Sequence, residues 1–164
     1  MNIERLEWDS SFFGFNVGAL RVDQDNYTGV QDAIAGADLK VIYIFVPEAL
    51  RVKLSPVISS LGGICYDRKV EYGKAVYKRN VPEGVNITEV SQINDSLEAL
   101  AYASGWRSRF RMDQKFSPFF KKMYYKWLET ACQSNDSKVL SVIAKDNLVG
   151  MVTVSIAHNS GKIG

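Results

Sequence analysis

The chain has 164 residues, 20 Lys and Arg against 18 Asp and Glu, a single His, and a formal net charge of +2. This length suits one domain, or one domain and part of a second, with enough residues to bury a core. A hydrophobic content of 46% and an aromatic content of 12% exclude a disordered chain, and no apolar run reaches the roughly 18 residues of a membrane span.

Residues 1–79 predict a small N-terminal α/β module. Extended segments are expected over 16–22 and 40–46, because both are rich in apolar or β-branched residues and Pro47 ends the second one. Residues 64–78 predict a return to extended structure. Three of its side chains are expected on inward positions, namely Val70, Tyr72 and Val76.

Two helices are expected between these extended segments. Thr28 fits the N-cap of a short helix over 28–37. Ser55 followed by Pro56 fits the cap and the first position of a second helix, where the missing N–H of proline costs nothing. The run Leu61-Gly62-Gly63 is typical of a helix end.

The segment 80–84 is the predicted linker to a second domain over 85–164, because Pro and Gly punctuate it and no apolar period crosses it. The second domain is expected to begin with a short strand at 87–90. Asn94, Asp95 and Ser96 then predict the cap of a helix that ends at Gly105. Its apolar face comprises Leu97, Leu100 and Ala101.

The clearest predicted element is a helix over 118–133, with Ser117 as its cap and Pro118 in its first position. Apolar residues recur along it at helical spacing, which indicates one stripe facing the core. That stripe comprises Phe120, Met123, Tyr124, Trp127, Leu128 and Ala131. The basic residues that lie away from it are Lys121, Lys122 and Lys126.

Residues 139–144 and 148–156 predict a β-hairpin across Asp146-Asn147, because both turn residues tolerate a positive φ. A turn at 158–161 then leads into 162–164, which look like the opening of a further strand. We expect this strand to leave a sheet edge unpaired and one side of the core open. Either a longer protein or another chain, as in a homodimer formed through that edge, would complete the fold.

Sequence motifs identify no catalytic residue, metal site or cofactor site in this chain. Phosphate-binding glycine loops, zinc-protease helices and nucleophile elbows are all absent from the sequence. His158 lies in a polar turn that is typical of a surface loop. Cys65 and Cys132 are far apart, are expected to be inert core thiols, and indicate neither a disulfide framework nor zinc. The N-terminus lacks the build of a secretory signal, so we expect a cytoplasmic protein.

One basic segment stands out as a candidate binding site. Residues 105–126 hold seven Lys and Arg and a single acidic residue, which indicates an anionic small-molecule ligand or else a solvated face. In an extended loop Arg107, Arg109 and Arg111 would point one way and could bind phosphate or carboxylate. Trp106 and Phe110 could stack on a base or sugar ring. The alternative is an ordinary loop in which Asp113 pairs with an arginine and Phe110 is anchored in the core.

Three blocks of residues, in order along the chain, carry a family resemblance. They are residues 6–18; residues 108–113 with Phe116 and 124–129; and residues 142–144, 148–154 and 161–164. Together these blocks resemble the GNAT superfamily of N-acetyltransferases, and within it the sugar-nucleotide N-acetyltransferases of the dTDP-fucosamine acetyltransferase type. The resemblance implies a mixed α/β fold, in which the N-terminal module precedes the first part of a GNAT domain built as strand, helix, helix and hairpin.

The resemblance also implies a function. Members transfer the acetyl group of acetyl-CoA to the amine of an amino-sugar nucleotide, and Arg109, Phe110 and Arg111 would line the pocket of this anionic acceptor. The family's loop for the acetyl-CoA pyrophosphate would follow Gly164, and its general-acid tyrosine is missing too, so this chain alone is expected to be inactive.

Structural roles are expected for several other residues that match the family. Trp8, Phe12 and Phe13 would pack the N-terminal module, and Gly14 would occupy a tight turn. Gly150 resembles a small residue of the family's third strand, and its alternative role is at a bulge or a close contact.

Two further functions are weighed against the enzyme. The first is a non-catalytic binding or assembly module, which is a degenerate remnant of an acetyltransferase. The second is nucleic-acid binding, which fits worse because the basic stretch is short and no RNA-binding motif matches. Neither nucleic acid nor a membrane is an expected partner.

Overall fold

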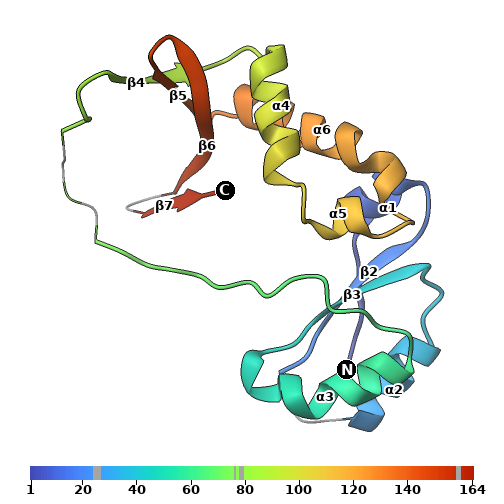
Figure 1. The fold of residues 1–164 in the computed structure, drawn as a ribbon. Coiled ribbons are helices and arrows are strands. Elements are labelled where there is room, and N and C mark those ends of the chain that lie inside the picture. The colour runs from blue at the N-terminus through green and yellow to red at the C-terminus, as the bar shows by residue number, and fades with distance from the viewer. Residues whose placement is uncertain (24–26, 76, 78–79, 158–159) are drawn as a thin grey trace. The chain divides into compact units, whose positions relative to one another are not determined.

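The computed structural model describes residues 1–23, 27–75, 77, 80–157 and 160–164, and its fold is shown in Figure 1. Within these residues the chain is a mixed α/β protein with two sheets and six α-helices, so the expected class is confirmed. Chain contacts divide it into two compact units, Met1–Tyr66 and Asp67–Gly164. This division falls before the predicted linker at 80–84, and each unit is described by itself.

The first unit is built around a three-stranded sheet in the order β1-β2-β3. β1 is antiparallel to β2, and β2 is parallel to β3. The elements in chain order are β1 (Glu4–Arg5), α1 (Glu7–Phe13), β2 (Val17–Arg21), α2 (Tyr27–Ala35), β3 (Val41–Phe45) and α3 (Glu48–Ser60). Both predicted strands are therefore confirmed, and the core comprises Leu20, Val22, Val30 and Leu54.

The aromatic block before β2 forms α1, which the sequence analysis did not predict. Gly14 ends it in the left-handed region at φ 75°, where its N–H donates to the Ser10 carbonyl, so the expected tight turn is confirmed. Phe13 is buried as expected. Trp8 is half-exposed and stacks on Phe12 with ring centroids 5.0 Å apart, so its packing is lateral rather than internal.

Two predicted helix starts in this unit are wrong. Thr28 lies inside α2 rather than at its N-cap. Ser55 and Pro56 lie inside α3, whose first residue is Glu48. The Ser55 hydroxyl donates to the Arg51 carbonyl at 2.6 Å, as a serine within a helix often does. Proline at position 56 has no N–H, so it leaves the carbonyl of Val52, an exposed residue, without its helical donor. The predicted helix end at Gly62, with φ 81°, is confirmed.

Residues 64–75 form no strand, which contradicts the predicted inward-facing segment. Val70 is 63% exposed and Tyr72 is 92% exposed, while Val76 lies outside the described residues. Single apolar residues alternate here with charged ones, such as Lys69 and Glu71, which pair with each other at 2.6 Å. Alternation of apolar and charged residues indicates a strand only where a neighbouring strand supplies backbone hydrogen-bond partners. No described strand pairs with residues 64–75.

The second unit contains a four-stranded antiparallel sheet in the order β4-β5-β6-β7. Its elements are β4 (Val85–Val90), α4 (Asp95–Ser104), α5 (Arg109–Met112), the 3-10 turn η1 (Ser117–Phe119), α6 (Phe120–Gln133), β5 (Ser137–Ala144), β6 (Asn147–Ala157) and β7 (Ser160–Ile163). Figure 1 shows α4 and α6 side by side next to the sheet. They pack against each other and on one face of it, where Leu97, Ala101, Leu128 and Val139 form the core.

Most helix signals in this unit act as predicted. The Asn94 side chain accepts a hydrogen bond from the Leu97 N–H at 2.9 Å and caps α4, and Gly105 ends the helix. Ser117, however, does not cap α6. It begins η1 together with Pro118, and α6 follows at Phe120 without a side-chain cap.

The predicted stripe on α6 faces the core only in part. Phe120, Met123 and Leu128 are buried, whereas Trp127 is 41% exposed. Tyr124 and Ala131 are half-buried.

The predicted hairpin is confirmed with a shifted turn. Lys145 and Asp146, with φ 49° and 60°, form its two-residue loop between the paired Ala144 and Asn147. The register shifts between Val142 and Ile143, opposite Gly150, so this glycine lies beside a β-bulge. The predicted turn at 158–161 falls partly on residues outside the described ones. β7 follows and pairs with β6 as an added strand.

The sheet of the second unit presents an apolar face on the side opposite α4 and α6. Paired residues share a face, and Ile87 pairs with Val142 while Ile163 pairs with Val154. These positions alternate with Val139, which faces the helices. Ile87, Ile156 and Ile163 are each at least half-exposed, so this face is uncovered in the part of the chain that the structure describes.

Candidate anion-binding site

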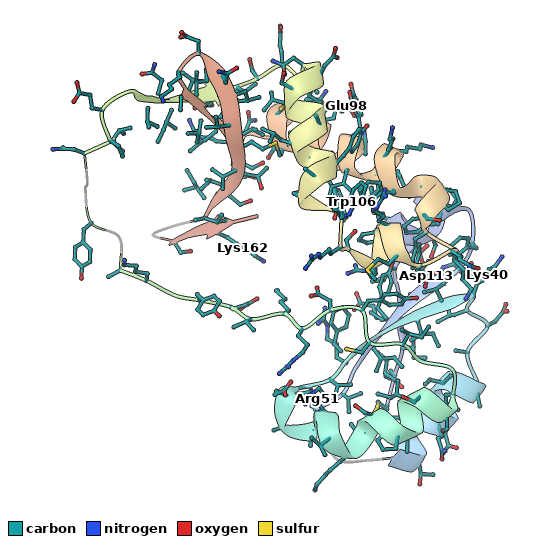
Figure 2. All side chains as sticks on the ribbon, in the orientation of Figure 1. Lys40, Arg51, Glu98, Trp106, Asp113 and Lys162 are labelled. Atoms are coloured by element: carbon teal, nitrogen blue, oxygen red, sulfur yellow. The ribbon has the colours of Figure 1, made fainter. Side chains whose placement is uncertain are left out.

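The basic segment lies where the end of α4, α5 and the beginning of α6 meet, and Figure 2 shows Trp106 directly after α4. The Arg111 guanidinium carbon lies 3.3 Å from the centroid of the Trp106 ring, and 5.8 Å from that of Phe120. Trp106 is nevertheless 59% exposed. A charged guanidinium thus lies on one face of an accessible indole, an arrangement that leaves its N–H edges able to donate.

The predicted extended loop is wrong, because residues 109–112 form the single turn α5. The N–H groups of Met112 and Asp113 donate to the carbonyls of Ser108 and Arg109. Residues two apart on a helix point in different directions. Arg109 and Arg111 therefore do not form the predicted one-sided row of guanidinium groups.

Phe110 explains why this turn forms. Its side chain is 3% exposed, and its ring packs edge-on against Phe116 and Trp127 at centroid distances of 5.6 and 5.3 Å. The Arg109 guanidinium lies 4.2 Å from the same ring. One half of the alternative is therefore confirmed, because Phe110 is anchored in the core and its ring contacts Arg109. The other half is wrong, because Asp113 forms no ion pair with an arginine among the described residues.

Asp113 is used in the turn that follows α5. Its Oδ1 accepts a hydrogen bond from the backbone N–H of Lys115 at 2.8 Å, and its carbonyl accepts from Phe116 and Ser117. This carboxylate therefore orders the chain that leads into η1. Among the described residues, Arg107, Arg111 and Lys121 form no ion pair with a carboxylate.

Two residues of α4, Glu98 and Tyr102, lie beside this site and were not predicted from the sequence as part of it. Tyr102 on α4 donates its hydroxyl to the Glu98 carboxylate one turn earlier. Burial, and then this hydrogen bond, raises the pKa of Tyr102 to about 12, so the phenol stays protonated at neutral pH. The Lys121 ammonium lies 5.5 Å from the Tyr102 ring. The spacing of four between Glu98 and Tyr102 was the available signal for their contact.

A concavity lies elsewhere in this unit, between the β4–α4 connection and the C-terminal half of α6. It has a volume of about 320 Å³. Its lining residues are Ser91, Gln92, Ile93, Tyr125, Glu129, Cys132 and Gln133. Burial raises the pKa of the Cys132 thiol, so this group is held in its unreactive protonated form.

Among the described residues, the remaining candidate groups form no catalytic cluster. Cys65 is exposed, which corrects its expected place in the core, and Cys132 is half-buried; in the described chain neither cysteine forms a disulfide. His158 lies outside the described residues. In the described parts of the chain, no cluster of three or more His, Cys, Asp and Glu could hold a metal ion. None of the helices described is both long and apolar enough to cross a membrane.

Comparisons with protein-family models, with curated proteins and with solved structures find no match to this chain. Any indication of a function therefore has to come from the residues described above. Among them, the Arg111–Trp106 pair is the arrangement with the clearest chemistry, because it combines an accessible aromatic surface with a cation that has no carboxylate partner in the described chain.

Proposed function

We propose that the chain provides the acceptor-binding part of an acetyl-CoA-dependent N-acetyltransferase of the GNAT type, with the nucleotide-linked amino sugar as acceptor. Two features support the proposal. The first is the resemblance of three sequence blocks to this family. The second is the order of elements from β4 to β7, in which two main helices separate the first strand from an antiparallel run of three. The fold expected from the resemblance has the same order.

The observation that carries the proposal is the pairing of Arg111 with Trp106 at 3.3 Å. The acceptor of such an enzyme is an anion, because its sugar is carried on a nucleotide. A guanidinium that is stacked on an indole keeps donors for phosphate oxygens. We therefore assign Arg111 to acceptor binding, with Arg109 beside it, while buried Phe110 holds the turn that carries both.

Acetyl transfer would join the sugar nitrogen to the acetyl carbonyl carbon and break the thioester bond, so that coenzyme A leaves as the thiol. The attacking amine must be neutral, and positioning it is the contribution that these residues can make.

The described residues do not fit acetyl-CoA itself. The pyrophosphate of that molecule needs a helix that opens on a Gly-rich loop, and no described helix of the second unit does so. No catalytic step is therefore assigned to them. We propose the cytoplasm as the location of the protein, because cysteines outside disulfides, as Cys65 and Cys132 are in the described chain, are usual in a reducing compartment.

A direct test measures binding of a nucleotide-linked amino sugar by calorimetry. We expect the chain to bind it, and Arg111→Ala to weaken binding about tenfold or more, because a charge-assisted contact to phosphate is lost. The melting temperature should stay within a few degrees. Arg51→Ala is the matched control, since this exposed arginine is already paired with Glu48 at 2.9 Å, and it should leave binding unchanged.

Acetyl-CoA titrated into the same chain should give no saturable heat. One-to-one binding would show that a cofactor site exists that we have not identified, and would contradict the assignment of acceptor binding alone. Absence of binding by every nucleotide-linked amino sugar would overturn the proposed function itself.

The second candidate function is a binding or assembly module that forms homodimers through the open edge of β7. The observation that favours it is the apolar sheet face, where Ile163 of the edge strand is 74% exposed. Analytical ultracentrifugation should then show a dimer at micromolar concentration, and Ile163→Lys should make it monomeric. Val52→Lys, a control at an exposed position of α3, should remain dimeric. A wild-type chain that stays monomeric at high concentration would exclude this candidate.

A further inference from the structure

The outer edge of β7 carries backbone groups that no described residue pairs with. β7 is the last strand in the order β4-β5-β6-β7, so β6 occupies only one of its two sides. The Gly164 N–H donates to the Thr153 carbonyl at 3.0 Å. Because hydrogen bonds in an antiparallel ladder alternate, Lys162 bonds to β6 as well, whereas the N–H and C=O groups of Gly161 and Ile163 point away from β6. An edge of this kind accepts a further strand.

The segment 69–73 has the residue pattern of a strand, although no described strand pairs with it. Val70 is 63% exposed and Tyr72 is 92% exposed, and the two alternate with Lys69 and Glu71. In an extended chain Val70 and Tyr72 would share one face, and the two charged side chains the other. β-Branched and aromatic residues favour strands because neighbouring strands cover them. This segment therefore matches a sheet that offers an apolar face beside an open edge.

A charge pair relates this segment to β7. The hydrogen bond and the charge of Lys69 lower the pKa of Glu71, and the charge of Lys162 lowers it further. Glu71 and Lys162 are therefore close enough to attract each other. Lys69 contacts Glu71 at 2.6 Å and lies two residues away, so this ion pair stays on one face when the segment is extended. Opposite charges directly across two strands stabilise their pairing, which favours Glu71 opposite Lys162.

The apolar side chains require the same register. Lys162 points to the side of the sheet on which α4 and α6 pack, whereas Ile163 belongs to the apolar face on the opposite side. In an antiparallel strand with this register, Val70 and Tyr72 lie on the apolar face, beside the exposed Ile163 and Ile156. A shift of one residue would turn both away from that face and place the carboxylate on it. The charges and the apolar residues thus favour one register, although neither depends on the other.

We propose that the outer edge of β7 is the docking site for residues 69–73 of the same chain, which add to the sheet as an antiparallel fifth strand with Glu71 opposite Lys162. The connection is long enough. Residues 74–84 lead from the segment to β4 at the far edge, and when extended they reach about 36 Å. The four strand spacings between β4 and the added strand amount to about 19 Å. The inference goes beyond acceptor binding, and it competes with a homodimer through the same edge.

A disulfide between the two paired positions tests the register. Glu71→Cys and Lys162→Cys are combined in the full chain. Cys65→Ser and Cys132→Ser remove the other thiols. In the proposed register the two new positions form a non-hydrogen-bonded pair, in which side chains approach closely enough for a disulfide. Under mild oxidation, peptide mapping by mass spectrometry should find this disulfide within one chain. Val70→Cys with Lys162→Cys is the matched control, because residue 70 is adjacent but points to the other face. Its disulfide should form at least about fivefold more slowly.

Hydrogen exchange in the unmodified chain gives a second measurement, which needs no substitution. The Gly161 and Ile163 amides should be protected although they do not donate to β6, because the added strand accepts from them. Tyr72→Asp should raise both exchange rates about tenfold or more, since it places a charge on the apolar face and so opposes docking. Tyr77→Asp is the matched control at an exposed tyrosine outside the segment, and it should change neither rate.

Equal rates of disulfide formation in the two cysteine pairs would overturn the proposal, because the segment would then have no fixed register on β7. Unprotected Gly161 and Ile163 amides in the unmodified chain would overturn it as well. Disulfides that join two chains would show that a second copy occupies the edge, which contradicts docking within one chain. Neither measurement involves the acceptor, so this proposal and the proposed function can fail separately.

Discussion

Replacing Leu128 by Ala should lower the free energy of unfolding by about 2–5 kcal/mol, the range for truncating a buried leucine. Leu128 is 2% exposed and lies in the core with Leu97, Ala101 and Val139. These four side chains come from α4, α6 and β5, so the shortened residue would leave a cavity where both helices meet the sheet. Urea denaturation followed by far-UV circular dichroism measures the effect.

Thr130→Ala is the matched control on the same helix, because Thr130 is exposed and two residues away. Its effect should stay within about 0.5 kcal/mol, as is usual for surface positions. A Leu128→Ala variant as stable as the control would mean that α6 does not pack on the sheet through this residue, and it would contradict the core described for the second unit.

Local signals in the sequence were sufficient where one residue decides one end of an element. Asn94 predicted the start of α4 because its side chain completes the first turn, and Gly105 predicted its end. The same reasoning failed at Pro56, since a proline marks the first turn of a helix only when no earlier start exists. Here Pro47 already precedes a helix that begins at Glu48. Pro47 and Pro56 are both local signals for the start of a helix, and the sequence alone does not show which of the two is used.

Non-local packing decided the parts that were not predicted. Arginines at alternate positions would share one side only in an extended chain, but burial of Phe110 between Phe116 and Trp127 favours the turn α5. The contact of Lys121 with Tyr102 likewise depends on how α4 packs on α6, which no spacing along the chain encodes. The composition of the candidate site was therefore predictable as a basic and aromatic segment, whereas its geometry was not.

A further large effect is expected at Gly105, the residue that ends α4 directly before Trp106. A Cβ atom there would lie 2.2 Å from the Tyr124 ring, much closer than carbon atoms approach in proteins. Tyr124 cannot move away freely, because its ring lies 4.8 Å from Phe120 and 5.2 Å from Trp127. Gly105→Ala should therefore destabilise the chain by about 1–3 kcal/mol, as overpacking does.

The matched control is Gly150→Ala in β6, where a Cβ would meet its nearest atom, on Val142, at an ordinary 3.9 Å. This variant should lose far less stability in the same urea titration, because no neighbour has to move.

Gly105→Ala should also displace the chain that carries Trp106 and its partner Arg111, so the affinity for a nucleotide-linked amino sugar should fall even under conditions in which the variant is fully folded. A folded Gly105→Ala protein with wild-type stability would show that Tyr124 does not pack on this glycine. Wild-type affinity for the nucleotide-linked amino sugar in a destabilised variant would instead show that the end of α4 does not position Trp106, because strain at residue 105 would then be absorbed before it reached the indole.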